Sequence, residues 1–272
     1  MSQEAQKGKR SKLKRLSDID RTRVNQVLDT DEAIYRQHSL EEAKTELTLF
    51  DEEINLFFEL ILFNENLHSA ITLEGMKDAR SAHGILMVDT FNCLRSIYKL
   101  LLDGYYSQLA PLLRRVNECS LRMLFFNNYP DKATLFLEKP DEWRKKYWKE
   151  EQIRRELKLK KDARLSKLTD ALRREYSNLS ELTHANIRAM ATHIYPSPQK
   201  KMVYLSVGGN LHDTWLHIYA RSLINWTMLG LKAATMPYYE VLQKLQAEWL
   251  DRAMKLEQAI KKLEKPSIEF ES

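Results

Sequence analysis

Two neighbouring segments with regularly spaced apolar residues constrain the fold more than any other feature of the sequence. They are AHGILMVDTFNCLRSIYKLLLDGYY (82–106) and SQLAPLLRRVNECSLRMLFFNNY (107–129). Their three- and four-residue spacing puts the apolar side chains on one face of an α-helix. With only 7 Gly and 7 Pro in 272 residues, the chain has too few turn-forming residues for many short strands. The sequence therefore predicts an all-α multi-helix bundle whose central helix pair is joined near Gly104.

Further helices are expected on both sides of this pair, for about seven to nine helices in a single domain over residues 30–265. Ser39 and Glu42 have the spacing of a capping box, which predicts a helix from residue 39 to about 64. Other helices are expected over 131–139, 141–163, 176–196, 214–235 and 237–263. The stretch KMVYLSV, followed by Gly208 and Gly209, predicts a small β-hairpin or an ordered loop near 200–212.

Charge is distributed unevenly along the chain, although the net charge is only +5. Residues 1–25 begin with six cations and one acid in the first 15 positions and hold few large apolar residues, so we expect a disordered basic tail. Residues 144–174 contain thirteen cations and five acids, whereas residues 31–74 contain eleven acids and two cations. This separation indicates either a face that binds polyanions or two oppositely charged segments that pair with each other.

Several functional classes are not supported by the sequence. Cys93 and Cys119 lie in apolar helical patterns without neighbouring metal ligands, which is typical of buried thiols in a reducing cytosol. The longest apolar run, INLFFELILF, spans about ten positions, against roughly twenty needed to cross a bilayer. No glycine-rich phosphate loop or nucleophile elbow occurs. We expect a cytoplasmic protein with no membrane span and no cofactor.

The expected helix over 176–196, YSNLSELTHANIRAMATHIYP, carries the most chemically suggestive side chains. Ser180, His184, Arg188 and Thr192 follow one another at four-residue steps and form a polar stripe. His193 lies nine residues beyond His184, about half a turn around the helix axis. The two histidines therefore belong to different faces, and at most one of them contributes to any one site.

The order of three motifs resembles an uncharacterised family of bacterial all-helical proteins. The motifs are APLLRRVNE (110–118), FFNNYPDKATLF (125–136) and YSNLSELTH (176–184), and the resemblance covers about residues 80–235. In that family an LLR...E helix precedes a helix with a Ser and a His. The resemblance implies a fold and no particular reaction.

The chain also resembles the HEPN superfamily of helical-bundle ribonucleases, because four residues separate Arg188 from His193. This resemblance implies metal-independent RNA cleavage at a dimer interface, with the His activating the ribose 2′-hydroxyl and the Arg stabilising the phosphate. Ala189 departs from the polar residue usual after the Arg, and the motif lies mid-chain. His184 with Glu118 is a second candidate catalytic pair. The alternative is that His184 and Arg188 are buried polar groups bonded to Glu118 and to nearby hydroxyls.

A di-iron site is a further possibility that the sequence supports only in part. Glu65–His68 and Glu181–His184 are both Glu-x-x-His motifs, and Glu118 offers another carboxylate. The expected helix over 214–235 has no Asp or Glu. The ligand set is therefore incomplete, and we expect no metal.

The segment 141–163 is polar nearly all round, which predicts a basic helix that protrudes into solvent. Its cations are candidates for phosphate contacts, and Trp148, with Trp143 and Tyr147, is a candidate for stacking on bases. The alternative is a solvated helix whose aromatic residues anchor it to the body. The candidate nucleic-acid-binding residues are Arg144, Lys145, Lys146, Trp148, Arg154, Arg155 and Lys158.

Together these patterns favour an RNA-interacting helical protein that resembles HEPN ribonucleases and toxins used in defence. The alternative is a non-catalytic interaction or scaffold module in which the His, Arg and Glu cluster is structural and the basic segment faces the acidic one. Apolar faces on the central helices and on the long helix after Pro237 predict a homodimer.

Overall fold

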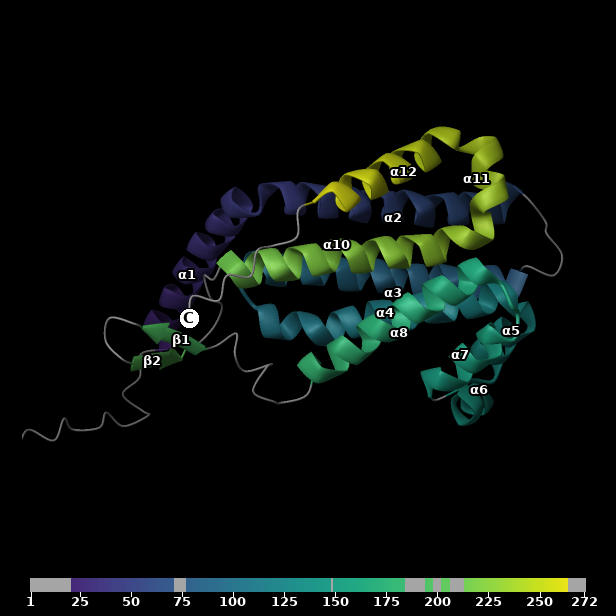
Figure 1. The fold of residues 1–272 in the computed structure, drawn as a ribbon, viewed down its shortest axis with the longest axis horizontal. Coiled ribbons are helices and arrows are strands. Elements are labelled where there is room, and N and C mark those ends of the chain that lie inside the picture. The colour runs from purple at the N-terminus through teal and green to yellow at the C-terminus, as the bar shows by residue number, and fades with distance from the viewer. Residues whose placement is uncertain are drawn as a thin grey trace, which may run out of the picture.

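The computed structural model describes residues 21–70, 77–147, 149–183, 194–197, 202–205 and 213–263. The predicted all-α fold is confirmed. Four helices, α2, α3, α4 and α10, run lengthwise through the molecule, and the other helices cover their sides and one end (Figure 1).

The central pair consists of α3 (Lys77–Leu102) and α4 (Leu109–Asn128), as the apolar spacing predicts. A short 3₁₀ helix, η2 (Tyr106–Gln108), precedes α4. Gly104 makes the turn between the two helices with a φ of 76°, in the left-handed region that favours glycine. The α4 residues that face the core are fully or almost fully buried, among them Leu113, Val116, Leu121, Leu124 and Phe125.

Helices α2 (Lys44–Ala70) and α10 (Asp213–Thr235) complete the bundle, and α10 packs on both α2 and α4. The contact between α10 and α4 is close at Gly230. A Cβ placed there would lie 3.2 Å from the Ser120 Oγ and 3.8 Å from a methyl of Val116. The absence of a side chain at Gly230 thus lets the two helices approach each other.

A helix was expected to begin at residue 39, but helix α1 (Arg21–Glu42) already covers this position. Ser39 is not a helix cap, because it lies inside α1 and is buried, and its Oγ donates to the Leu102 carbonyl at 3.2 Å. The hydroxyl therefore joins α1 to the end of α3. Residues 21–25, expected in the basic tail, belong to this helix, and residues 1–20 lie outside the described part.

The basic segment forms short packed helices in place of the expected protruding one. After α5 (Pro130–Glu138), it contains α6 (Pro140–Tyr147) and α7 (Glu150–Lys158), which gather with α5 at one end of the bundle (Figure 1). Lys149 adopts an extended conformation that separates α6 from α7. The expectation was wrong because each helix buries a narrow stripe, which includes Trp143, Tyr147, Ile153 and Leu157.

Asp162 precedes helix α8 (Ala163–Thr183), and its Oδ1 accepts from the backbone amides of Arg164 and Leu165 at 2.7 and 2.9 Å. These two hydrogen bonds lower the pKa of the Asp162 carboxyl, because they stabilise its charged form. The cap explains why the chain starts a new helix here after the turn that follows α7.

The expected helix over 176–196 does not reach its predicted end. Ile194–Ser197 forms strand β1, which pairs antiparallel with β2 (Met202–Leu205), so that Pro196 lies opposite Val203. A strand at a sheet edge tolerates a proline because its missing amide leaves no partner unsatisfied. Of the two alternatives expected near 200–212, a hairpin or an ordered loop, the hairpin is present, and it begins earlier than expected, with strands at 194–197 and 202–205. Residues 184–193 and 206–212 lie outside the described part.

The expected last helix, 237–263, is divided into a 3₁₀ turn, η4 (Met236–Tyr238), and two helices, α11 (Tyr239–Leu245) and α12 (Ala247–Lys262). The break falls at Gln246, which has a φ of −144° and a ψ of 47°. This corner turns α12 back along α2, on which it packs (Figure 1).

Candidate functional site

Three acidic residues of α2, Glu46, Glu52 and Glu59, form ion pairs with residues of α10 and α12. The Glu46 Oε1 accepts from the Arg221 Nε at 3.0 Å and lies 3.2 Å from the His217 Nδ1. Burial raises the pKa of Glu46, but hydrogen bonds from its own backbone amide, Arg221 and His217 outweigh burial and hold the pKa below its ordinary value. Arg252 of α12 donates to both Glu52 and Glu59.

These ion pairs show where three acidic residues of segment 31–74 find partners. In Figure 1, α2 lies along one side of the bundle, and α6 and α7 lie on the opposite side. The ion pairs found for the described acids of α2 go to α10 and α12. The alternative in which the basic segment pairs with the acidic one is not supported by these ion pairs.

Most cations of the basic segment are exposed. Lys158 lies 3.8 Å from Asp170, and the Lys160 ammonium lies over the Tyr129 ring. We call the exposed cations of α6, α7, α8 and their connections the basic surface; they are Arg144, Lys145, Lys146, Lys149, Arg155, Lys158, Lys160, Lys161, Arg164, Lys167, Arg173 and Arg174. Of the predicted nucleic-acid-binding residues, Arg154 is buried and Trp148 lies outside the described part.

Two aromatic residues of the basic segment anchor it to the body. Trp143 and Tyr147 are buried, with ring centroids 4.5 Å apart, and both contact Phe125 of α4. Because neither ring is open to solvent, neither can stack on a base. The stacking prediction is wrong for these two residues, and the alternative, that the aromatic residues anchor the segment, is confirmed for them.

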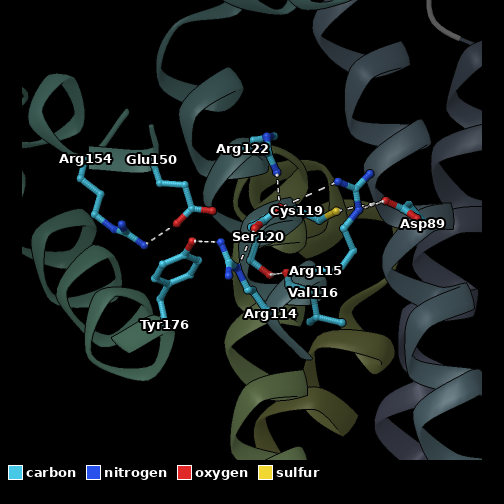
Figure 2. A network of polar contacts seen from close by, with 11 residues as sticks. Asp89, Arg114, Arg115, Val116, Cys119, Ser120, Arg122, Glu150, Arg154 and Tyr176 are labelled. Atoms are coloured by element: carbon cyan, nitrogen blue, oxygen red, sulfur yellow. Dashed lines mark hydrogen bonds and ion pairs between the residues drawn. The ribbon is translucent and has the colours of Figure 1, made fainter. Parts of the chain in front are cut away.

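A cleft of about 660 Å³ opens between α4, α7 and α8, and we call it the arginine cleft. Five of its lining side chains are cationic and three are carboxylates, which leaves an excess of two positive charges. Figure 2 shows its central residues, which point toward one another from the three helices. The lining residues are Arg114, Glu118, Arg122, Lys149, Glu150, Glu151, Arg154, Arg173, Tyr176 and Ser177.

Tyr176 of α8 contacts two of the guanidinium groups. The Arg114 Nη2 donates to the Tyr176 hydroxyl at 2.5 Å, and the guanidinium carbon lies 4.8 Å from the ring centroid. The guanidinium carbon of Arg154 lies 5.3 Å from the same centroid. Burial raises the pKa of Tyr176, so its hydroxyl stays protonated at neutral pH. The ring therefore fixes the positions of both arginines through cation–π contacts.

Glu150 and Arg154 form an ion pair on one face of α7. They are 8% and 5% exposed, and the Arg154 Nη2 donates to the Glu150 Oε2 at 2.9 Å. Burial raises the pKa of the Glu150 carboxyl. Among the described residues, the Glu150 Oε1 and the Arg154 Nε have no hydrogen-bond partner. The pair thus leaves one buried acceptor and one buried donor without a partner at the wall of the cleft.

Glu118, a candidate catalytic residue, lies in the same cleft and is surrounded by arginines of its own helix. Its carboxylate oxygens are 3.2 Å from the Arg114 Nε, 3.9 Å from the Arg115 Nη1 and 3.6 Å from the Arg122 Nη1. The other catalytic candidates, His184, Arg188 and His193, lie outside the described residues, so their proximity to Glu118 stays a prediction.

Sequence reasoning named only Glu118 and Arg154 among the cleft residues and missed the others, including Arg114, Arg122 and Tyr176. A signal for two of them was available, because Arg114, Glu118 and Arg122 follow one another at four-residue steps and share one helix face. Tyr176 gave no such signal, since its place in the cleft depends on how α8 packs on α4.

The arrangement suits the binding of an anion. Guanidinium groups donate paired hydrogen bonds that match a phosphate or carboxylate. Within the described ranges, no group of three or more His, Cys, Asp and Glu side chains is placed to hold a metal ion. A search of the same residues finds no helix long and apolar enough to cross a membrane.

The fold and the cleft define an all-α bundle protein with a cationic cleft between three of its helices. Comparison of the chain with protein-family models, with curated proteins and with solved structures finds no match.

Proposed function

We propose that this protein binds nucleic acid, and RNA in particular, through phosphate contacts made by the basic surface next to the arginine cleft. The observation that carries the proposal is the exposure of the cations on α6, α7 and α8, while Glu46, Glu52 and Glu59 of α2 pair with α10 and α12. RNA is the substrate that the resemblance to HEPN ribonucleases implies.

The buried aromatic residues favour one mode of binding over another. With Trp143 and Tyr147 packed against α4, phosphate contacts are better supported than stacking on bases. Such contacts carry little sequence information and release counterions, so binding weakens steeply as the salt concentration rises. We therefore expect weak sequence preference and a strong dependence on salt.

A salt titration with matched variants tests the proposal. Lys145→Gln, Lys146→Gln and Arg155→Gln together remove three exposed cations from the basic surface. For a single strand, each lost phosphate contact reduces the slope of log K against log salt by about 0.7, so the triple variant should lower the slope by about 2. Fluorescence anisotropy with a labelled single-stranded RNA measures it.

The matched control removes the same charge from α12, on the opposite side of the bundle. Lys255→Gln, Lys261→Gln and Lys262→Gln change the net charge equally. An unchanged slope in this control and a reduced slope in the first variant support a local contact surface. Equal slopes in both variants, or no RNA binding by the unmodified protein, contradict the proposal.

We also propose that the protein cleaves RNA. Arg188 with His193, or His184 with Glu118, would supply a base that takes the proton of the ribose 2′-hydroxyl and a cation that stabilises the phosphate. The 2′-oxygen then bonds to phosphorus, the bond from phosphorus to the 5′-oxygen breaks, and the 5′-oxygen takes up a proton. The test is cleavage of labelled RNA in EDTA by the unmodified protein, His184→Ala, His193→Ala and Glu118→Gln. Loss of cleavage in a variant with an unchanged circular dichroism spectrum supports catalysis. Absence of cleavage by the unmodified protein contradicts it.

A scaffold role is the second candidate, and the ion pairs of Glu118 favour it. Three arginines of α4 surround this carboxylate, an arrangement that stabilises the helix and its packing without any catalytic role. In that case Glu118→Gln lowers the free energy of unfolding and leaves RNA affinity unchanged. Urea denaturation and RNA titration of the same variant separate the two roles.

A homodimer is also part of the proposal, and an apolar patch on α2 and α3 supports it. Phe58 and Leu62 are 44% and 41% exposed, and Ile85 and Val88 are 55% and 43% exposed. Phe58 stacks on Phe91, which joins the two helix faces into one patch. Phe58→Glu should convert a dimer into a monomer in light scattering, whereas Leu159→Glu, at an exposed position after α7, should not.

A further inference from the structure

We infer that the arginine cleft binds the terminal phosphate group of a nucleic-acid strand, or the same group on a mononucleotide. If the phosphate belongs to a nucleic-acid strand, the inference rests on the proposed function and names the part of the strand that the cleft recognises. If the phosphate belongs to a mononucleotide, the inference is independent of RNA binding.

The size and charge of the cleft fit this class of ligand. Its volume of about 660 Å³ lies within the roughly 300–1,000 Å³ typical of small-molecule sites. Its excess of two positive charges matches a phosphate monoester, which carries a charge of about −1.5 to −2 at pH 7. An internal phosphodiester carries a single negative charge and needs no recess, because it can bind along an open surface.

The guanidinium groups are held in place before any ligand binds. Arg114 is fixed by Glu118 and by the Tyr176 hydroxyl, at 3.2 and 2.5 Å. Arg154 is fixed by Glu150 and lies over the Tyr176 ring. Binding therefore costs little side-chain entropy, since these rotamers are already restricted.

Unpaired buried atoms supply a second and independent indication of a ligand. The Arg154 Nε and the Glu150 Oε1 are buried and have no hydrogen-bond partner among the described residues. The Arg122 Nη1 likewise lacks a hydrogen bond, although it lies 3.6 Å from the Glu118 carboxylate. Buried polar atoms are normally paired, so these three atoms indicate a partner that binds in the cleft.

The carboxylates of the cleft complement the other end of a nucleotide. Glu118 and Glu150 would repel a phosphate that approached them directly, but they accept hydrogen bonds from hydroxyl groups. A terminal nucleotide carries ribose hydroxyls next to its phosphate. The cleft is therefore organised so that arginines bind the phosphate while a carboxylate accepts from the sugar, which fixes the orientation of the strand end.

Oligonucleotides that differ only at their ends test the inference. We compare one RNA sequence with a 5′-phosphate, with a 3′-phosphate and with no terminal phosphate, by competition in fluorescence anisotropy. At least one phosphorylated end should bind about tenfold more tightly than the unphosphorylated strand, as expected for added charge-assisted hydrogen bonds. Adenosine monophosphate and inorganic phosphate, added alone, should raise the midpoint of thermal unfolding.

Two variants remove the recognition, and a third serves as the matched control. Arg114→Gln removes one guanidinium. The double variant Glu150→Gln with Arg154→Gln replaces the buried ion pair by two amides, which leaves no buried charge unpaired. Lys255→Gln removes one exposed charge from α12, outside both the cleft lining and the basic surface. The first two should lose the preference for a phosphorylated end, and Lys255→Gln should keep it.

The outcomes distinguish the inference from the proposed function. RNA binding without any end preference, together with no effect of adenosine monophosphate on thermal unfolding, overturns the inference and leaves the proposed function standing. Stabilisation by adenosine monophosphate that is lost in Arg114→Gln, without RNA binding, supports the cleft and contradicts the proposed function. An end preference that persists in both folded cleft variants also overturns the inference.

Discussion

The Tyr238 hydroxyl donates to the Asn64 Oδ1 at 2.6 Å and joins η4 to α2 across 174 residues of sequence. Both residues are buried, with exposed fractions of 4% and 3%. The same amide lies close to α3, because its Nδ2 is 3.1 Å from the position of a Cβ at Gly84. One buried hydrogen bond therefore ties together three segments that are distant in the sequence.

Replacing Tyr238 by Phe should destabilise the fold measurably. The variant keeps the ring but leaves the Asn64 carbonyl oxygen buried without its donor, which costs about 1–3 kcal/mol. Tyr239→Phe is the matched control, because Tyr239 is adjacent and 48% exposed, and should change stability by less than about 0.5 kcal/mol. Urea denaturation of both variants measures the difference. Equal stabilities would show that the bond contributes nothing.

Replacing Glu53 by Met should stabilise the protein at neutral pH. Glu53 is fully buried, and no described residue hydrogen-bonds either of its carboxylate oxygens. Burial raises the pKa of this carboxyl well above its ordinary value. The folded state therefore holds a proton that the unfolded state releases above about pH 4.5, and stability falls as the pH rises through this window.

The expected gain for Glu53→Met is about 1–3 kcal/mol at pH 7, the usual cost of an unsatisfied buried polar group. Guanidinium denaturation between pH 4.5 and 8 should show a gain over the unmodified protein that grows with pH. Glu59→Gln, at an exposed position of the same helix that pairs with Arg252, should show no such trend. A constant difference across the range contradicts the prediction.

The burial of His83 should make the stability of the fold depend on pH in the direction opposite to that of Glu53. Its ring is fully buried without a hydrogen-bond partner among the described residues, and burial lowers its pKa from 6.5 to about 4. Since the unfolded state binds a proton below pH 6.5 and the folded state does not, stability falls as the pH drops from 6.5 to 4. The loss is on the order of 3 kcal/mol.

The variant His83→Phe keeps an aromatic ring beside Tyr238 but cannot titrate. Its stability relative to the unmodified protein should therefore improve steadily as the pH falls from 6.5 to 4. The measurement is the denaturation midpoint in guanidinium at several pH values. A parallel decline in both proteins would assign the acid sensitivity to other groups.

Cys119 should be unreactive in the folded protein. Burial raises the pKa of its thiol to about 12, and its Sγ lies 3.4 Å from the Asp89 Oδ2. Cys93 is also buried, and burial raises its pKa. Iodoacetamide at pH 8 should modify neither thiol without denaturant and both in guanidinium, as read by mass spectrometry. Rapid modification in native buffer would contradict the burial of these residues.

The helices that bury a broad apolar face could be predicted from the sequence. The spacing in α3 and α4 and the turn at Gly104 are present as expected. The breaks at Ala43, Lys149 and Gln246 could not be predicted, because none of these positions carries a Pro or Gly. Tertiary packing sets them, since each lets the next helix turn onto a neighbouring face.

The candidate site could be predicted only in part, for a related reason. The charge of the basic segment and the presence of Glu118 follow from the sequence, but the burial of Arg154 does not. Arg154 and Arg155 are identical in type and adjacent, and only the packing of α7 on α4 and α8 decides which of them lines the cleft. The sequence alone does not show which of the two arginines is buried.

The packing of α12 on α2 has a consequence for how the protein forms during synthesis. Arg252 contacts Glu52 and Glu59 across about 200 residues of chain, so α2 leaves the ribosome long before its partner helix exists. Because synthesis proceeds at about 5–20 residues per second, α2 remains without α12 for roughly 10–40 seconds. The nascent amino-terminal half thus exposes α2 for tens of seconds, and its acidic character keeps it hydrated during that interval.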